Sequence, residues 1–111
     1  MAQAVFVHQG ASIDYTPGSN VSAGDVIVQA ELIGVAKLDI VANKLGALAV
    51  EGVFDFAKAT GGGSGIAVGT TVYWDDTNNV ATATATGNKL IGKVVKAAAD
   101  ADATVRVRLS Q

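Results

Sequence analysis

Residues 21–28 read Val-Ser-Ala-Gly-Asp-Val-Ile-Val, and residues 66–74 read Ile-Ala-Val-Gly-Thr-Thr-Val-Tyr-Trp. Both stretches place a glycine-centred turn before a short apolar strand, and each is followed by Leu-Ile-Gly, at positions 32–34 and 90–92. Each then ends in a β-prone run, at residues 47–50 and 104–109. This repeated local plan predicts short antiparallel strands and a diverged internal duplication.

The alternation of apolar and polar residues predicts an all-β fold, a small β-barrel or sandwich of short antiparallel strands. Strands are expected at residues 25–30, 47–56, 71–74, 80–86 and 104–109. Residues 32–45 are ambiguous, because Val35, Leu38, Val41 and Leu45 fit a helical stripe. We favour strands at 32–33 and 40–41, linked by a turn at 42–44, since two glycines interrupt a long helix.

The expected core is built mainly from aliphatic side chains, because the chain has only six aromatic residues. Arg106 and Arg108 alternate with the inward residues of their strand and should face solvent. The predicted core residues are Val26, Val28, Leu32, Leu48, Val50, Val72, Leu90, Val105 and Val107.

The chain divides into an N-terminal arm, residues 1–12, and a single β-domain, residues 13–111. The glycine-rich segment 61–65 is expected to be a flexible loop between the two repeats. The arm is apolar and β-prone, and Gln9-Gly10-Ala11-Ser12 separates it from the domain. We predict that it binds a partner subunit or a neighbouring copy of the chain. The candidate partner-binding residues are Ala2, Gln3, Ala4, Val5, Phe6, Val7 and His8.

Composition excludes several classes of function. The net charge of −2 and the lack of a Lys/Arg cluster argue against nucleic-acid binding, and the absence of cysteine removes disulfides and thiolate sites. No apolar run is long enough to span a membrane, and no secretory signal is expected at residues 1–8.

Tests for catalytic and ligand-binding motifs are negative. Gly65 is followed by Ile66 rather than by the lysine of a phosphate loop, and the pair Asp76 and Asn78 lacks the other ligands of a calcium loop. His8 is the only histidine, and it lies in the arm. We expect no enzyme activity, no cofactor and no metal site.

An alternative function is carbohydrate binding or adhesion. Tyr73 and Trp74 would then form an exposed aromatic platform, although a single indole at a strand end is more often a core or interface anchor.

Six segments together carry a resemblance to a known family. They are Ile13–Gly18, Val21–Val26, Leu48–Phe54, Val72–Asp75, Leu90–Gly92 and Ala103–Leu109. In this order and at these intervals the chain resembles the tailed-bacteriophage head proteins regarded as capsid decoration, or cement, proteins.

The resemblance implies a β-rich structural virion protein that is made in the host cytoplasm and binds the outer surface of the assembled capsid. It implies that the protein stabilises the expanded shell by bridging subunits of the major capsid protein, as a homo-oligomer, with a trimer favoured. The family provides no catalytic residues to assign to this chain.

Overall fold

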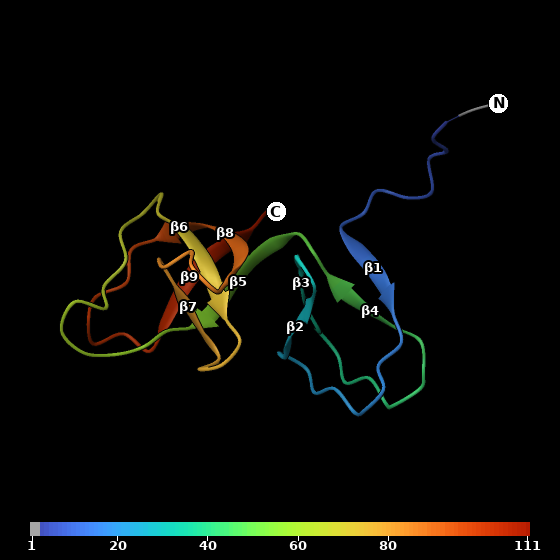
Figure 1. Ribbon diagram of the computed structural model, residues 1–111, viewed down its shortest axis with the longest axis horizontal. Helices are drawn as coiled ribbons and strands as arrows, with labels where there is room; N and C mark the ends of the chain where they lie inside the picture. Colours follow the sequence, from blue (N-terminus) through green and yellow to red (C-terminus); the bar gives the residue numbers. More distant parts are fainter. Residues whose placement is uncertain (1–2) are drawn as a thin grey trace.

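The computed structural model describes residues 3–111, and within them every regular element is a β-strand, as predicted (Figure 1). The strands are β1 (Ser12–Tyr15), β2 (Val26–Gln29), β3 (Leu32–Val35), β4 (Gly46–Ala49), β5 (Gly52–Ala57), β6 (Thr71–Asp75), β7 (Val80–Thr82), β8 (Lys89–Lys96) and β9 (Thr104–Leu109).

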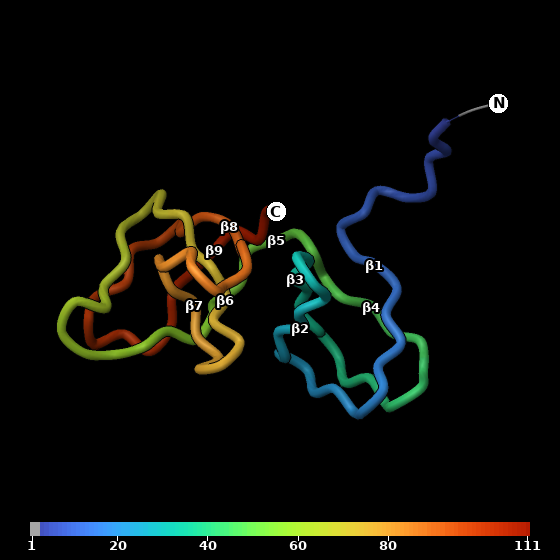
Figure 2. Tube along the Cα trace, in the orientation of Figure 1, coloured from blue at the N-terminus to red at the C-terminus, as the bar shows by residue number. Residues whose placement is uncertain are grey.

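The strands form two antiparallel sheets rather than a closed barrel. The first sheet has the order β1-β4-β3-β2, and the second has the order β5-β9-β8-β6-β7. The chain completes the first sheet before it enters the second, and the two sheets lie side by side along the longest axis (Figure 2). Polar contacts between them include two hydrogen bonds of 2.6 Å that the Gln111 side chain exchanges with the backbone of Ile33, and the ion pair of Lys89 with Glu31 at 2.7 Å.

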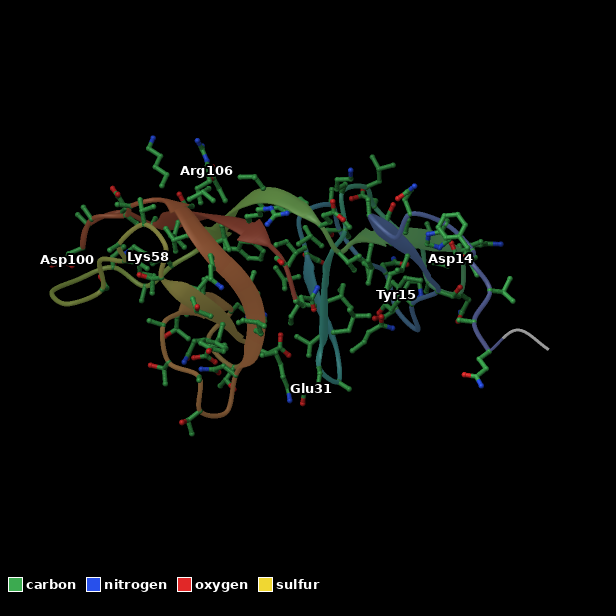
Figure 3. The ribbon with its side chains drawn as sticks, turned by 90° about the horizontal axis from the view of Figure 1, so that it is seen from above. Asp14, Tyr15, Glu31, Lys58, Asp100 and Arg106 are labelled. Atoms are coloured by element: carbon green, nitrogen blue, oxygen red, sulfur yellow. The ribbon has the colours of Figure 1, made fainter. Side chains whose placement is uncertain are left out.

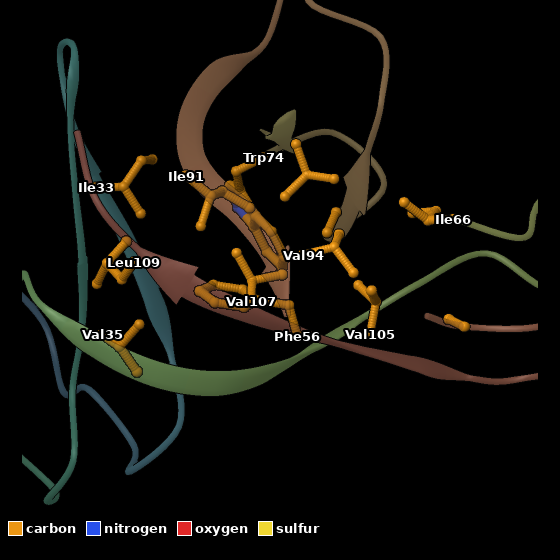
Figure 4. Close-up of a cluster of buried hydrophobic side chains, with 13 residues drawn as sticks. Ile33, Val35, Phe56, Ile66, Trp74, Ile91, Val94, Val105, Val107 and Leu109 are labelled. Atoms are coloured by element: carbon orange, nitrogen blue, oxygen red, sulfur yellow. The ribbon is translucent and has the colours of Figure 1, made fainter. Parts of the chain in front are cut away.

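The main core lies between the second sheet and one face of β2 and β3 (Figure 4). Ile33 and Val35 of β3 enter it, while the opposite face of the first sheet has a smaller core of its own around Leu48. The smaller core contains Val21, Ala36, Ile40 and Leu48, with Ile13, Tyr15 and Ile27 packed against it.

The predicted core is right at four of its nine residues and wrong at the leucines of both Leu-Ile-Gly units. Four predicted residues are buried: Leu48, Val72, Val105 and Val107. Leu32 and Leu90 are instead 37% and 36% exposed, and the isoleucine that follows each is fully buried. Val26, Val28 and Val50 are half-buried. Arg106 and Arg108 face solvent as expected.

Two predicted strands are shorter than expected. The expected strand 47–56 is broken at Val50 and Glu51, where the chain leaves the first sheet, and Gly52 adopts a φ of +124° as the second sheet begins. The expected strand 80–86 ends at Thr82, whose Oγ1 accepts a hydrogen bond from Thr84 N–H at 3.2 Å. Such local side-chain bonds compete with the sheet ladder.

The loop between β3 and β4 contains the predicted turn at 42–44, in which Asn43 has a φ of +65°. The strand expected at 40–41 is wrong, because only Ile40 pairs, and its partner is Val21. The turns at 23–25, 75–79 and 100–102 lie where the sequence predicts them.

Hydrogen bonds around the two glycine turns recur at constant spacing. Gly24 N–H donates to the Ala36 carbonyl at 2.6 Å, and Gly69 N–H donates to the Val94 carbonyl at 2.8 Å. Gly69 lies 45 positions after Gly24, and Val94 lies 58 positions after Ala36. The same spacings relate two isolated bridges, Val21–Ile40 and Ile66–Ala98.

Candidate functional site

The predicted partner-binding arm is exposed throughout its described part. Ala2 lies outside the described residues, whereas Gln3, Ala4, Val5, Phe6, Val7 and His8 are all exposed. The three large apolar side chains, Val5, Phe6 and Val7, are 77%, 78% and 82% exposed, and this part of the chain leads away from β1 (Figure 1). The structure therefore presents one uncharged apolar segment that the cores of the two sheets do not use.

His8 has a local role in this segment. Its Nδ1 accepts a hydrogen bond from Gly10 N–H at 3.0 Å, and Gly10 has a φ of +80°. The bond fixes the chain direction two residues before β1, where glycine tolerates this backbone conformation at little cost.

The aromatic platform proposed as an alternative is not formed. Trp74 is only 5% exposed, packs against Phe56 with 6.0 Å between ring centroids, and donates from Nε1 to Asp76 Oδ1 at 3.1 Å. Tyr73, its neighbour, points to the opposite face of β6, since consecutive side chains alternate. A buried indole cannot stack on a sugar, so Trp74 acts as a core anchor.

The glycine-rich segment 61–65, which we expect to be a flexible loop, makes several hydrogen bonds to Asp100. Asp100 Oδ1 accepts from Gly65 N–H at 2.6 Å, and the Asp100 carbonyl accepts from Gly61 N–H and Ser64 Oγ, each at 2.9 Å. Lys58 is buried beside it and donates to the Ala59 carbonyl at 2.7 Å (Figure 3). The segment connects β5 to β6 within the second sheet.

Hydrogen bonds to carboxylates make the stability of the fold dependent on pH. The backbone N–H of Gly65 lowers the pKa of Asp100, the Arg106 guanidinium lowers the pKa of Asp55, and Asn78 lowers the pKa of Asp75. The unfolded chain then binds more protons than the folded chain below about pH 4, so the free energy of unfolding falls as the pH drops through that region.

We therefore expect Asp100→Asn, which keeps an acceptor for Gly65 N–H but does not titrate, to lose less stability between pH 5 and pH 3 than the original chain. Urea denaturation at both pH values measures the difference. An identical pH dependence in the two proteins would show that Asp100 does not contribute.

A second apolar surface, which sequence reasoning missed, lies between β3 and β4. Leu38, Val41 and Leu45 are 77%, 61% and 70% exposed and line a pocket of about 420 Å³ on the first sheet. Their spacing resembles a helical stripe, but no helix forms. The sequence did contain an indication of this surface, because these three large apolar residues follow the periodicity of no strand or helix that forms.

Other kinds of site are absent from the described part of the chain. Residues 3–111 contain no group of three or more His, Asp or Glu side chains placed to hold a metal ion. They also contain no helix of the length and apolarity needed to cross a membrane. The arm and the pocket beside β4 are the exposed apolar features from which we argue a binding function.

A comparison with protein families gives one match. The family described as phage cement protein matches residues 7–109, nearly the whole chain. No curated protein and no solved structure matches the chain.

Proposed function

The chain belongs to the phage cement protein family, and from this we propose that it binds the outer surface of a phage capsid and stabilises the expanded shell by bridging capsid subunits. The family match carries the proposal, because residues 7–109 include both sheets and all nine strands; residues 1–6 of the arm and residues 110–111 lie outside the match. Family membership itself makes the protein a structural, capsid-associated component of a phage virion.

The shape of the molecule supports a bridging role. Its principal extents are 53 × 34 × 23 Å, with the two sheets placed along the longest axis (Figure 1). An elongated molecule can contact more than one subunit of a shell at the same time. Contacts that must break together strengthen one another through effective concentration, so individually weak contacts suffice.

The proposed partners are the major capsid protein and further copies of this chain, with a trimer favoured. The exposed arm supports contact with a neighbour, since an extended apolar segment can add a strand to another sheet. No catalytic step is part of the proposed function, and no cofactor is required for it.

The recurrence of hydrogen bonds supports a diverged duplication as the origin of the fold. The order β1-β4-β3-β2 of the first sheet corresponds to β5-β9-β8-β6 of the second, with β7 as an addition. In this correspondence β1 pairs with β4 through Asp14 and Ala47, and β5 pairs with β9 through Asp55 and Arg106. The chain then carries two related surfaces, which have diverged in sequence.

Co-sedimentation with capsids tests the proposed binding. Purified protein is mixed with expanded and with unexpanded shells of the phage, and the pelleted fraction is measured by gel densitometry. We expect saturable binding to expanded shells and weaker binding to unexpanded shells. Equal recovery with and without shells would refute the proposal.

Deletion of residues 2–8 tests the arm. We expect thermal unfolding of the isolated protein to stay nearly unchanged, because Val5, Phe6 and Val7 are exposed and pack in neither core. Retention on expanded shells should weaken, since ordering the arm costs about 1 to 2 kcal/mol per residue and only a partner's contacts offset that cost. Retention equal to that of the full chain would contradict the assignment.

A further inference from the structure

The pocket on the first sheet has the walls of a docking site for an apolar strand. Leu38, Val41 and Leu45 line it from the β3–β4 loop, and Ser12, Ala47 and Ala49 line it from β1 and β4. Three charged residues of the same loop, Lys37, Asp39 and Lys44, also belong to the lining. The alanines leave room over the sheet, while the three large side chains stay exposed around it. Burial of an apolar side chain in such a surface is favourable, because it removes apolar area from water.

The corresponding pocket of the second sheet is polar. That pocket measures about 250 Å³ and is lined by Lys96, Asp102, Thr104 and the ion pair of Asp55 with Arg106. By the constant spacing of 58, Lys96 takes the place of Leu38. Val35 pairs with Ala49 in the first sheet, and the equivalent residue Lys93 pairs with Arg108 in the second, so Ala49 corresponds to Arg108. Counting back by the same number of residues from each, Thr104 corresponds to Leu45. Of these two corresponding pockets, the one in the first half is therefore the more apolar.

We propose that this pocket binds the arm of a second copy of the chain, with the Phe6 side chain entering it and Val5 and Val7 on the opposite face of the extended arm. The arm fits by chemistry, because residues 2–9 carry no Asp, Glu, Lys or Arg that would have to be desolvated. It also offers three large side chains that contribute to neither core of their own copy.

The adjacent sheet edge fits an extended arm. β1 ends the first sheet and pairs only with β4, so its other edge is open, and its first residue, Ser12, lies in the pocket wall. An arm added to this edge would satisfy unpaired backbone groups while its alternate side chains reach the pocket. In its own copy the arm runs directly into β1 and leads away from the sheet, so the partner is a neighbouring copy (Figure 1).

The inference deepens the proposed function, because it identifies the contact that joins copies on the shell, and it rests on that function for bringing the copies together. A chain without cysteine allows a direct test by disulfide formation. Phe6→Cys is mixed with Leu38→Cys under mild oxidation, both as free protein at high concentration and bound to expanded shells. Phe6→Cys mixed with Lys96→Cys is the matched control, since Lys96 has the equivalent place in the polar pocket.

We expect linked heterodimers in the Leu38→Cys mixture at a yield about tenfold above the control, because a disulfide forms only when the two Cα atoms come within about 7 Å. Leu38 is 77% exposed, so its replacement does not disturb a core. Non-reducing electrophoresis measures the yield, and mass spectrometry identifies the linked peptides.

Three outcomes would overturn the inference. One is an equal yield with Lys96→Cys, and another is the absence of a disulfide in both the free and the shell-bound protein. The third concerns a chain that carries both Phe6→Cys and Leu38→Cys. An intramolecular disulfide in this chain, with no linkage between chains, would place the arm in the pocket of its own copy.

Normal binding to shells without the disulfide would refute this inference alone. Failure to bind shells, with the disulfide formed in solution, would refute only the proposed function.

Discussion

Replacement of Gly92 by alanine is expected to destabilise the protein by about 3 kcal/mol or more, at the upper end of the range for overpacked sites. A Cβ at this position would lie 2.0 Å from the Arg108 carbonyl oxygen and 2.9 Å from the Ser110 nitrogen. Both atoms belong to the backbone, so no side chain can move aside. β8 and β9 would have to separate, and they carry Ile91 and Val107 of the main core.

Urea denaturation measures this loss, and Gly18→Ala provides the control. An added Cβ at Gly18 meets no atom within 4 Å, and its φ is not positive, so that substitution should be neutral or slightly stabilising. Gly34 belongs to the other Leu-Ile-Gly unit, and a Cβ there would lie 2.8 Å from Leu48 Cβ, so Gly34→Ala should fall between the two. A Gly92→Ala protein as stable as the control would show that β8 and β9 are not as close as the structure has them.

Truncation of Ile91 to alanine is expected to cost about 2 to 5 kcal/mol, whereas truncation of Leu90 should cost far less. Ile91 is fully buried in the main core, and Leu90 is 36% exposed. The first half provides a matched pair, since Ile33 is fully buried and Leu32 is 37% exposed. The free energy of unfolding of all four variants tests the orientation of both Leu-Ile-Gly units.

If the leucine variants lost more stability than the isoleucine variants, both strands would be turned by one residue, and the leucines would form the core. Circular dichroism of each variant before denaturation shows whether the fold is retained. A variant that cannot fold counts as a loss at the top of the expected range.

The strands that sequence reasoning found are those whose pattern is local. In β9 the alternation of valine with arginine is strict, so the strand and its inward residues could be predicted directly. In β5 the pattern shows that the two phenylalanines share a face, but the predicted core omits Phe56, which is buried. The turns at 75–79 and 100–102 carry Asp and Asn side chains that bond to their own backbone, as in Asp75 with Thr77 N–H at 3.0 Å.

The orientation of the Leu-Ile-Gly units depends on partners that the local pattern does not reveal. In the first unit, the turn at Ala30 and Glu31 sets Val28 opposite Ile33, so the isoleucine shares the face of the valine. In the second, the register of β6 with β8 shifts between Val72 and Tyr73, and Ile91 has no partner in β6. Such an irregularity re-aims a side chain, and it arises only when the strands pair.

The candidate site divides in the same way. The arm could be proposed from the sequence, because an uncharged apolar run set off by Gly10 is visible without a fold. The pocket could not, because Leu38 and Leu45 come together with Ala49 only when β4 pairs with β3 and the intervening loop closes over the sheet. The anchoring of segment 61–65 by Asp100 likewise joins residues 35 positions apart.

Reinforcement of a phage shell by this protein can be measured as the thermal stability of the shell itself. Expanded shells lacking this protein are heated with and without a saturating amount of it, and the temperature of shell disruption is followed by light scattering and electron microscopy. We expect a higher disruption temperature with the full chain and a smaller increase with the chain lacking residues 2–8. An unchanged disruption temperature at full occupancy of the shell would contradict the proposed reinforcement.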